Sequence, residues 1–287
     1  MRPAHALASL HLAVALFGFA GLFGPWLALP PTLVVLGRTA IAAATLALLA
    51  AVTRTASKPT ADLALNGPVL ALHWVAFFAA IQVAGVAVGL IGFASFPLWT
   101  LILERVTGQR RAGRRDAVVA VLVVVGLMLT VRRLDLQDEV VRGLAWGVLS
   151  GATFAWLAVR NRRFARTHAA RTIALWQNAF AAACLIPVAV LLDAAARPTA
   201  RELALLVVLG VVCTALAHTL FVASLATVSA HTASVVAALE PVYGIALATA
   251  LLGERPTIGM LAGCALLVIA SVVASRDAAG RMPDSPG

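Results

Sequence analysis

Charged residues are scarce in this chain. Only 12% of its 287 residues are Asp, Glu, Lys or Arg, whereas soluble domains carry about 25%. Hydrophobic residues make up 62% of the sequence, and the mean hydropathy is +0.97. A soluble protein of this size could not bury so much apolar surface, so the sequence predicts an all-α polytopic membrane protein.

Acidic residues are fewer than basic ones, with 12 Asp and Glu against 22 Lys and Arg, so the net charge is +10. A strongly basic balance is one mark of nucleic-acid binding. Here, however, the basic residues fall in short loops between apolar runs, where they set the orientation of membrane spans. We therefore expect no nucleic-acid partner and a lipid bilayer around the chain.

Cysteine is also scarce, and Cys184, Cys213 and Cys264 each lie inside an apolar run. An odd number at scattered spacing provides neither a disulfide framework nor a metal signature. No pair of His or acidic residues has metal-ligand spacing, and no glycine-rich loop with Lys could hold a nucleotide. The sequence also shows no set of nucleophile, base and metal ligand that could form one catalytic site. We therefore expect no metal, no cofactor and no catalytic residues, and we do not expect the protein to be an enzyme.

Apolar runs of about 20 residues, the length that crosses a bilayer, recur along the chain. The first run follows Arg2 as in a signal peptide, but no cleavage site precedes more soluble sequence and further spans follow at once. Residues 69–103 hold no charge and are enough for two spans, with Gly85, Gly89 and Gly92 as possible turns. The sequence predicts ten helices, at about residues 5–24, 32–53, 69–86, 88–106, 117–134, 143–160, 172–192, 203–224, 230–252 and 257–275.

Basic residues also orient these helices. With the N-terminus inside, fifteen of the 22 Lys and Arg residues lie in the segments that face the cytoplasm and six lie in the outer loops. This bias fits an even number of spans. We expect both termini, including the tail 276–287, on the cytoplasmic side of a bacterial inner membrane.

The chain contains an internal sequence repeat, in which a segment of the first half resembles a segment of the second half. A shift of 144 residues places Phe96-Pro97 on Glu240-Pro241, and a second offset aligns residues 38–46 with residues 177–185. The chain therefore divides into two related halves, 1–134 and 143–275, each of five predicted helices. Because five is odd, the second half must enter the membrane from the opposite side. The predicted fold is thus ten transmembrane helices in two five-helix inverted-topology repeats, an architecture typical of secondary transporters.

Several short segments carry a family resemblance. They are residues 210–218 (GVVCTALAH), Leu239-Glu240-Pro241, residues 252–255 (LGER) and the run around Gly263, with a looser first-half match at Arg38, residues 72–74 (LHW), Pro97 and Gly126. With them the chain resembles the EamA-type branch of the drug/metabolite transporter superfamily. The resemblance implies a ten-helix inner-membrane carrier, often an exporter of amino acids or related metabolites, with a central cavity between the halves.

The chain departs from the family pattern at three positions. Phe96 stands in the first half where the second has Glu240, and Gln109 stands where the second has Glu254. His218 stands where the family commonly has Tyr. The two halves are therefore not expected to contribute equivalent acidic groups.

Glu240 lies next to Pro241 at the edge of an apolar helix. A charge there is costly in lipid, so it should face protein or water, and such a residue is a functional-site hypothesis by default. A carboxyl in a low-dielectric site could alternate between charged and neutral forms, which would couple transport to protons. The alternative is structural, with Glu240 bracing a broken helix by accepting bonds from exposed amides. Glu254 is expected to bracket a helical hairpin together with Arg255.

Arg38 lies several residues inside the second predicted helix. A guanidinium can hold a substrate carboxylate through two parallel hydrogen bonds, so Arg38 is a substrate-binding candidate. The alternatives are that its side chain extends to the outer interface or pairs with an acidic residue.

The remaining substrate-binding candidates are aromatic or polar residues within spans. Trp74, Phe78 and Gln82 share one stripe at helical spacing, with His73 beside it, and could form a cavity wall or pack in the ordinary way. Trp99 and Tyr243 occupy matching positions in the repeat and could line both sides of one cavity. Two further candidates, for which packing is the alternative, are His218, which shares a helix face with Thr214, and Trp176.

The sequence therefore predicts a secondary transporter, acting as an exporter, of a small organic metabolite such as an amino acid or derivative. The two halves would rock about a central cavity, with protons as a second partner through Glu240. The first alternative is a lipid-linked flippase, which would have a laterally open and mostly apolar cavity. The second is a membrane-embedded enzyme, for which the chain offers no converging catalytic group.

Overall fold

The computed structural model describes residues 3–54, 58–108, 113–130, 138–193, 195–228, 233 and 236–279. Within these ranges every regular element is a helix. The elements are α1 (Pro3–Ala20), α2 (Phe23–Trp26), α3 (Pro31–Val52), α4 (Ala61–Phe93), α5 (Phe96–Val106), α6 (Arg114–Met128), α7 (Glu139–Phe164), α8 (Ala170–Leu192), α9 (Ala200–Gly210), the π-helical turn η1 (Val211–Leu216), α10 (Ala217–Leu225), α12 (Glu240–Leu252) and α13 (Ile258–Ala279).

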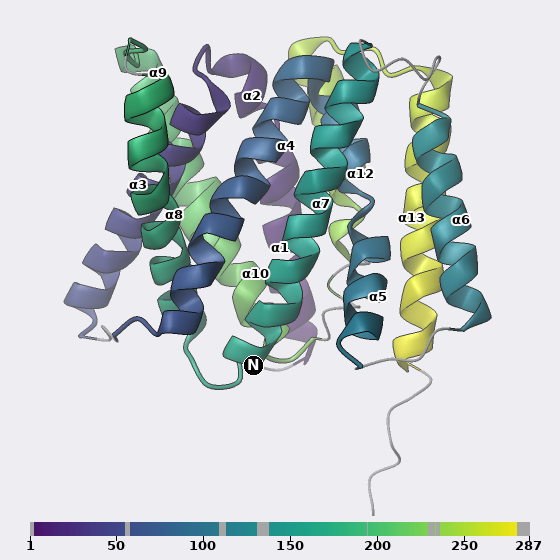
Figure 1. Ribbon diagram of the computed structural model, residues 1–287, viewed down its shortest axis with the longest axis horizontal. Coiled ribbons are helices and arrows are strands. Elements are labelled where there is room, and N and C mark those ends of the chain that lie inside the picture. The colour runs from purple at the N-terminus through teal and green to yellow at the C-terminus, as the bar shows by residue number, and fades with distance from the viewer. Residues whose placement is uncertain are drawn as a thin grey trace, which may run out of the picture.

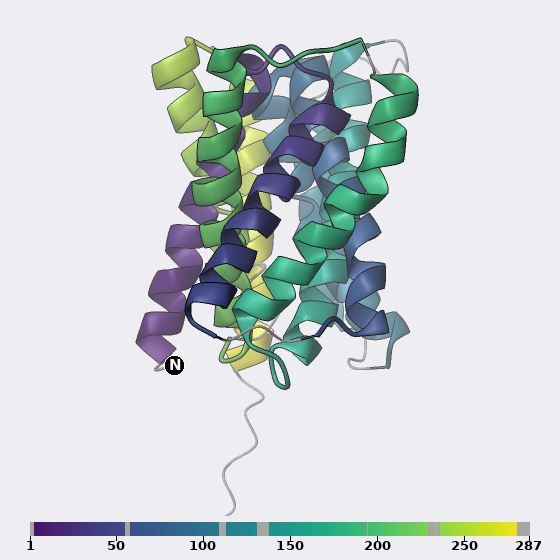
Figure 2. The ribbon, with the colours of Figure 1, turned by 90° about the vertical axis from the view of Figure 1, so that its left-hand side faces the viewer.

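The helices form one bundle in which most axes run between the same two end faces (Figures 1 and 2). We call the end at which α3, α9 and α13 begin the far face, at the top of Figure 1; α1 begins at the other end. Six segments are long and apolar enough to cross a membrane: 4–26, 31–52, 63–93, 139–164, 170–192 and 200–225. Shorter apolar helices lie at 116–128, 240–252 and 258–273. Because helices satisfy their own backbone hydrogen bonds, these segments make a multi-pass membrane protein.

The third predicted helix differs from the structure at its start, whereas its predicted end agrees with the break at Gly85, one of the three glycines expected to allow a turn. It begins at Ala61 rather than at residue 69, and its chain reverses at Gly85, where φ is 87° and ψ is 167°. A Cβ added to Gly89 would lie 3.1 Å from the backbone nitrogen of Ile81, so the segments before and after Gly85 pack side by side. Only glycine adopts such a φ without strain, and the uncharged sequence marks the turn in no other way.

The start of α4 was missed because residues 66–68, Asn-Gly-Pro, have the composition of a loop. In the structure Asn66 is fully buried, donates to Asn161 Oδ1 (3.2 Å) and accepts from Arg160 Nε (2.9 Å), both on α7. These partners from a distant part of the chain stabilise a helical start that local sequence disfavours.

The other boundary differences follow from breaks inside predicted spans. The fourth predicted helix, 88–106, is interrupted at residues 94–95, and α5 then begins with Pro97 in its first turn. The ninth, 230–252, appears as α12 from Glu240 onward, and most of its earlier residues lie outside the described ones. Gln109, residues 131–137 and residues 280–287 of the predicted tail also lie outside them.

The core sits where α1, α4, α7 and α10 meet, and aromatic rings fill it: Phe17, Phe77, Phe93, Phe154 and Phe221 are all buried. Close helix crossings frame this core. At the crossing of α4 and α7, Gly92 faces Gly147, and small residues of this kind let two backbones approach in membrane proteins.

Replacing Gly147 with Ala should destabilise the bundle, because the new Cβ would lie 2.8 Å from Gly92 Cα and 2.9 Å from the Gly89 carbonyl oxygen. Forced separation of two backbones costs about 1–3 kcal/mol or more. We expect a lower melting temperature in detergent for Gly147→Ala than for wild type. The control is Gly113→Ala, where the new Cβ meets nothing within 4 Å. Equal melting temperatures of the two variants would contradict the close crossing.

Candidate functional site

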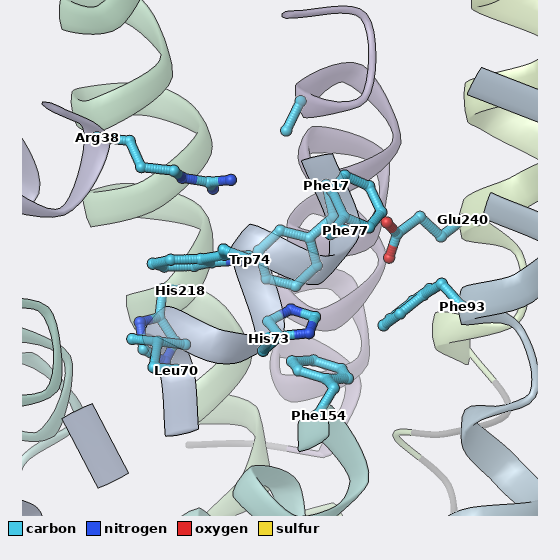
Figure 3. A pocket seen from close by; sticks show the side chains of 11 residues that line it. Phe17, Arg38, Leu70, His73, Trp74, Phe77, Phe93, Phe154, His218 and Glu240 are labelled. Atoms are coloured by element: carbon cyan, nitrogen blue, oxygen red, sulfur yellow. The ribbon is translucent and has the colours of Figure 1, made fainter. Parts of the chain in front are cut away.

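A small cavity lies inside the bundle, where α1, α3, α4, α7, α10 and α12 approach one another (Figure 3). Its volume is about 20 Å³, which is room for about one water molecule. Its wall is mostly aromatic and contains one arginine, one glutamate and two histidines. The lining residues are Phe17, Ala20, Arg38, Leu70, His73, Trp74, Phe77, Phe93, Phe154, His218 and Glu240.

Arg38 reaches the cavity from α3 and is only 1% exposed. Its guanidinium carbon lies 4.0 Å from the centre of the Trp74 ring, which is cation–π distance. Nε donates to Thr214 Oγ1 (2.9 Å) and one terminal nitrogen donates to the Cys213 carbonyl (3.3 Å). These contacts fix the side chain so that it extends over Trp74 toward the cavity (Figure 3).

Thr214 can accept from Arg38 because its helix changes geometry at this point. Residues 211–216 form the π-helical turn η1, and the Thr214 hydroxyl donates to the Leu209 carbonyl five residues earlier, at 2.7 Å. Turns of this kind inside α-helices are frequent at functional sites. The hydroxyl's own hydrogen is thereby used, which leaves its lone pairs to Arg38.

Glu240 is the first residue of α12, and 2% of it is exposed. Its backbone packs tightly on α1, where a Cβ added to Gly18 would lie 3.1 Å from the Glu240 carbonyl oxygen. Its carboxylate extends into the cavity from the side opposite Arg38 (Figure 3). Oε2 is buried and has no hydrogen-bond partner within the part of the chain that the structure describes. The bracing role left open above therefore has no supporting side-chain bond among these residues.

Two histidines complete the polar part of the wall. The Nδ1 atom of His73 lies 3.0 Å from the Ser150 carbonyl oxygen and 2.9 Å from the Ser150 hydroxyl, and its ring stacks on Phe154 with centroids 4.9 Å apart. The Nδ1 atom of His218 lies 3.2 Å from the side-chain nitrogen of Asn178. The His218 ring meets Trp74 edge-on at 5.9 Å.

The structure brings five of the sequence-based candidates together at this cavity: Arg38, His73, Trp74, His218 and Glu240. Phe78 lies just outside, fully buried, with its ring 5.4 Å from the Arg38 guanidinium carbon. Gln82 lies at the far face, where it donates to the Leu29 carbonyl (2.9 Å). Trp176 packs on Phe180 at a centroid distance of 6.0 Å.

Trp99 and Tyr243, expected on two sides of the cavity, are not among its lining residues. Tyr243 is 36% exposed on the surface of α12. The close packing of α12 on α1 is the physical reason, because a Cβ on Gly18 would already lie 3.2 Å from the Tyr243 Cβ.

Sequence reasoning missed the apolar part of the wall. Phe17, Phe93 and Phe154 are ordinary residues of apolar spans, and no local signal separates a cavity-lining Phe from one that packs elsewhere. Ser150 was also missed, because its contact with His73 joins residues of different predicted halves.

The far face is closed by polar contacts between distant segments. The loop after α2 donates from Ala28 N to Glu202 Oε1 (3.1 Å), and Thr32 donates to the Asp193 carboxylate. Glu254, in the turn between α12 and α13, accepts from Val86 N (2.9 Å) and Ala87 N (3.2 Å). Glu254 therefore caps the segment of α4 that begins after Gly85, in addition to its predicted place in the hairpin turn.

Comparisons with known proteins agree with this fold. Residues 141–276 match the model of the EamA-like transporter family, which belongs to the drug/metabolite transporter superfamily. The second half of the chain is therefore similar to this family. A solved crystal structure of a protein superposes with a TM-score of 0.72 at 19% identity, over 99% of this chain and 100% of that one, which shows a shared fold. No curated protein matches the chain. The match over this half indicates a membrane transporter of the drug/metabolite type.

Removing the cap on α4 should destabilise the far face. Glu254→Ala leaves two backbone N–H groups without their acceptor, which costs about 0.5–2 kcal/mol. We expect a lower melting temperature in detergent for this variant. Arg255→Ala, at the exposed neighbouring position, is the control and should melt like wild type. An unchanged melting temperature for Glu254→Ala would show that the cap contributes nothing.

Proposed function

We propose that this protein is a secondary transporter that exports a small organic metabolite, such as an amino acid or derivative, across the bacterial inner membrane. Transport would occur by alternating access about the cavity between the two halves. The observation that carries the proposal is the pair Arg38 and Glu240, a basic and an acidic side chain that face one cavity from opposite sides (Figure 3).

The burial of these two charges is costly unless each has a partner. Arg38 is held by a hydroxyl, a carbonyl and an indole ring rather than by a carboxylate. Glu240 Oε2 has no partner among the described residues. A bound metabolite with charges of both signs would supply what each side chain lacks, so the arrangement supports a small polar or amphipathic organic substrate.

The helix contacts support two interlocked halves, 1–134 and 143–275. α1 of the first half packs on α10 and α12 of the second, while α7 of the second packs on α4 and α5 of the first. α3 packs on α8, and α6 packs on α13. In each of these pairs, the two helices occupy corresponding positions in the two proposed halves. Reciprocal contacts of this kind are those expected of two inverted copies, so they support the ten-span layout and rocking of one half against the other.

The size of the cavity supports a moving mechanism. A volume of about 20 Å³ admits no organic metabolite, so the cavity must widen and open toward one membrane face at a time. The contacts at the far face, including the Glu202 bond to Ala28, would have to break for one of these openings. With both termini in the cytoplasm, as the basic loops favour, the far face is the outer one.

A lipid-linked flippase would have a laterally open and mostly apolar cavity, and that cavity would also need a place for the lipid headgroup. The structure has an apolar hollow of about 730 Å³ between α12 and α13, lined by residues such as Val242, Thr249 and Leu261. Among the described residues, no charged side chain or histidine lines it. The polar groups lie instead in the central cavity, which favours a soluble metabolite as substrate.

The proposal is tested with purified protein in proteoliposomes. We expect counterflow of at least one amino acid or derivative by the wild-type protein. Under an imposed pH gradient, Glu240→Gln should lose gradient-driven accumulation, because its amide cannot carry the coupled proton across. Glu139→Gln, the same change at an exposed site in the first turn of α7, is the control. Unchanged proton-dependent uptake by Glu240→Gln would reject the coupling role, and absence of counterflow for every metabolite would reject the transporter.

A further inference from the structure

A second hollow lies at the far face, beside α2 and the first segment of α4 (Figure 1). We call it the far-face hollow. Its volume is about 610 Å³, against about 20 Å³ for the central cavity. Pockets for small organic ligands measure about 300–1,000 Å³. The far-face hollow is therefore large enough for a metabolite, whereas the central cavity is not. Its wall is formed by α2, the loop that follows α2 and the end of the first α4 segment, and it includes Gly24, Ala28, Ile81, Gln82 and Gly85.

The far-face hollow and the central cavity are separated by about one helical turn. On α4, Phe77 lines the cavity and Ile81, four residues later, lines the hollow. Four residues of an α-helix rise about 6 Å. The same spacing recurs where α1 leads into α2, because Ala20 lines the cavity and Gly24 lines the hollow. The barrier between the two spaces is therefore thin.

The side chain of Ile81 occupies this barrier. It is 2% exposed and packs on the α1–α2 junction, residues 21–24. A Cβ added to Gly24 would lie 2.5 Å from Ile81 Cγ2, and a Cβ added to Gly21 would lie 3.6 Å from Ile81 Cδ1. The absence of a side chain on these glycines leaves the space between α4 and the junction to Ile81.

Polar contacts hold the loop after α2 in place above this apolar contact. Ala28 N donates to Glu202 Oε1 (3.1 Å), and the Leu29 carbonyl accepts from the Gln82 side chain (2.9 Å). Water at the membrane surface can replace such partners, so the net cost of breaking each bond is small, about 0.5–1.5 kcal/mol. The α1–α2 junction can therefore move away from Ile81 once these bonds are exchanged for water.

We propose that the far-face hollow is a second site on the transport route, a vestibule that takes the metabolite after it leaves the central cavity, and that Ile81 is the gate residue between them. With the α1–α2 junction packed on Ile81, the path is closed. Movement of the junction away from α4 joins the hollow to the cavity. This inference rests on the proposed transport function and locates its passage at the far face.

Thiol labelling of the full-length protein tests the position of the gate. The reporter is Ala20→Cys in the wall of the central cavity, with the three native cysteines replaced by alanine. The probe is a charged methanethiosulfonate, applied to protein in nanodiscs so that both faces are reached whatever the orientation. We expect Ile81→Ala to raise the labelling rate about tenfold or more, because loss of buried side-chain atoms weakens the closed state.

The matched control is Ile91→Ala, the same change at a fully buried position of α4 in a different apolar cluster. It should leave the labelling rate of the reporter near that of the unmodified gate. An unchanged rate in Ile81→Ala, or an equal increase in both variants, would overturn the inference.

A reversible crosslink separates a gate from ordinary packing. A Cβ added to Gly24 would lie 3.3 Å from the Ile81 Cβ, near the Cβ–Cβ separation of a disulfide, which is about 3.5–4.5 Å. The double variant Gly24→Cys with Ile81→Cys, in the same background without native cysteines, should lose metabolite exchange in proteoliposomes about tenfold or more when oxidised, because the junction is then fixed to α4. Reductant should restore exchange, and each single variant should be insensitive to oxidant.

The failure of the gate and the failure of the transport function give different results. Exchange that continues in the fully crosslinked double variant would overturn the gate and leave the transport function intact. Absence of exchange in wild-type proteoliposomes, with every metabolite, would reject the transport function itself. Loss of exchange that reductant does not reverse would show a packing defect instead of a gate and would also overturn the inference.

Discussion

The contact of the Arg38 guanidinium with the Trp74 ring is the interaction on which the site depends. A permanent positive charge inside an apolar bundle is costly, and the indole face at 4.0 Å, the Thr214 hydroxyl and the Cys213 carbonyl offset that cost without neutralising the charge. Arg38 therefore stays available as a cation. Its counterpart Glu240 reaches the same cavity from another helix, and the closed bundle keeps both away from bulk solvent.

The two halves of the chain play unequal parts around this pair. Phe96 stands at the repeat position that corresponds to Glu240, and it is buried against Phe93 and Phe154 instead of presenting a carboxylate. Gln177 stands where Arg38 would have its counterpart, and it bonds Asn161 in a buried network away from the cavity. In the proposed two-repeat arrangement, the cavity thus receives one arginine and one glutamate rather than two of each. A single dipolar site fits one small ligand in one orientation.

The sequence predicted the polar residues that line this cavity better than it predicted the phenylalanine wall or the shape of the cavity. Arg38, Glu240, His73 and His218 were recognisable because polar groups in apolar spans are costly and therefore informative. The positions of Tyr243 and Trp99 were not predictable, since repeat symmetry does not fix which face a helix turns inward. The reversal at Gly85 falls at one of the glycines expected to allow a turn, but its cap by Glu254 and the contact of Thr214 in the π-helical turn with Arg38 come from distant segments. Local pattern cannot reveal such partners.

A structure of the protein with a bound amino acid would test the central claim most directly. The account predicts a widened cavity in which the ligand carboxylate contacts Arg38 and the ligand ammonium contacts Glu240, with Arg38 still stacked on Trp74. A direct ion pair between Arg38 and Glu240 with the ligand bound elsewhere, or a ligand in the reverse orientation, would contradict it.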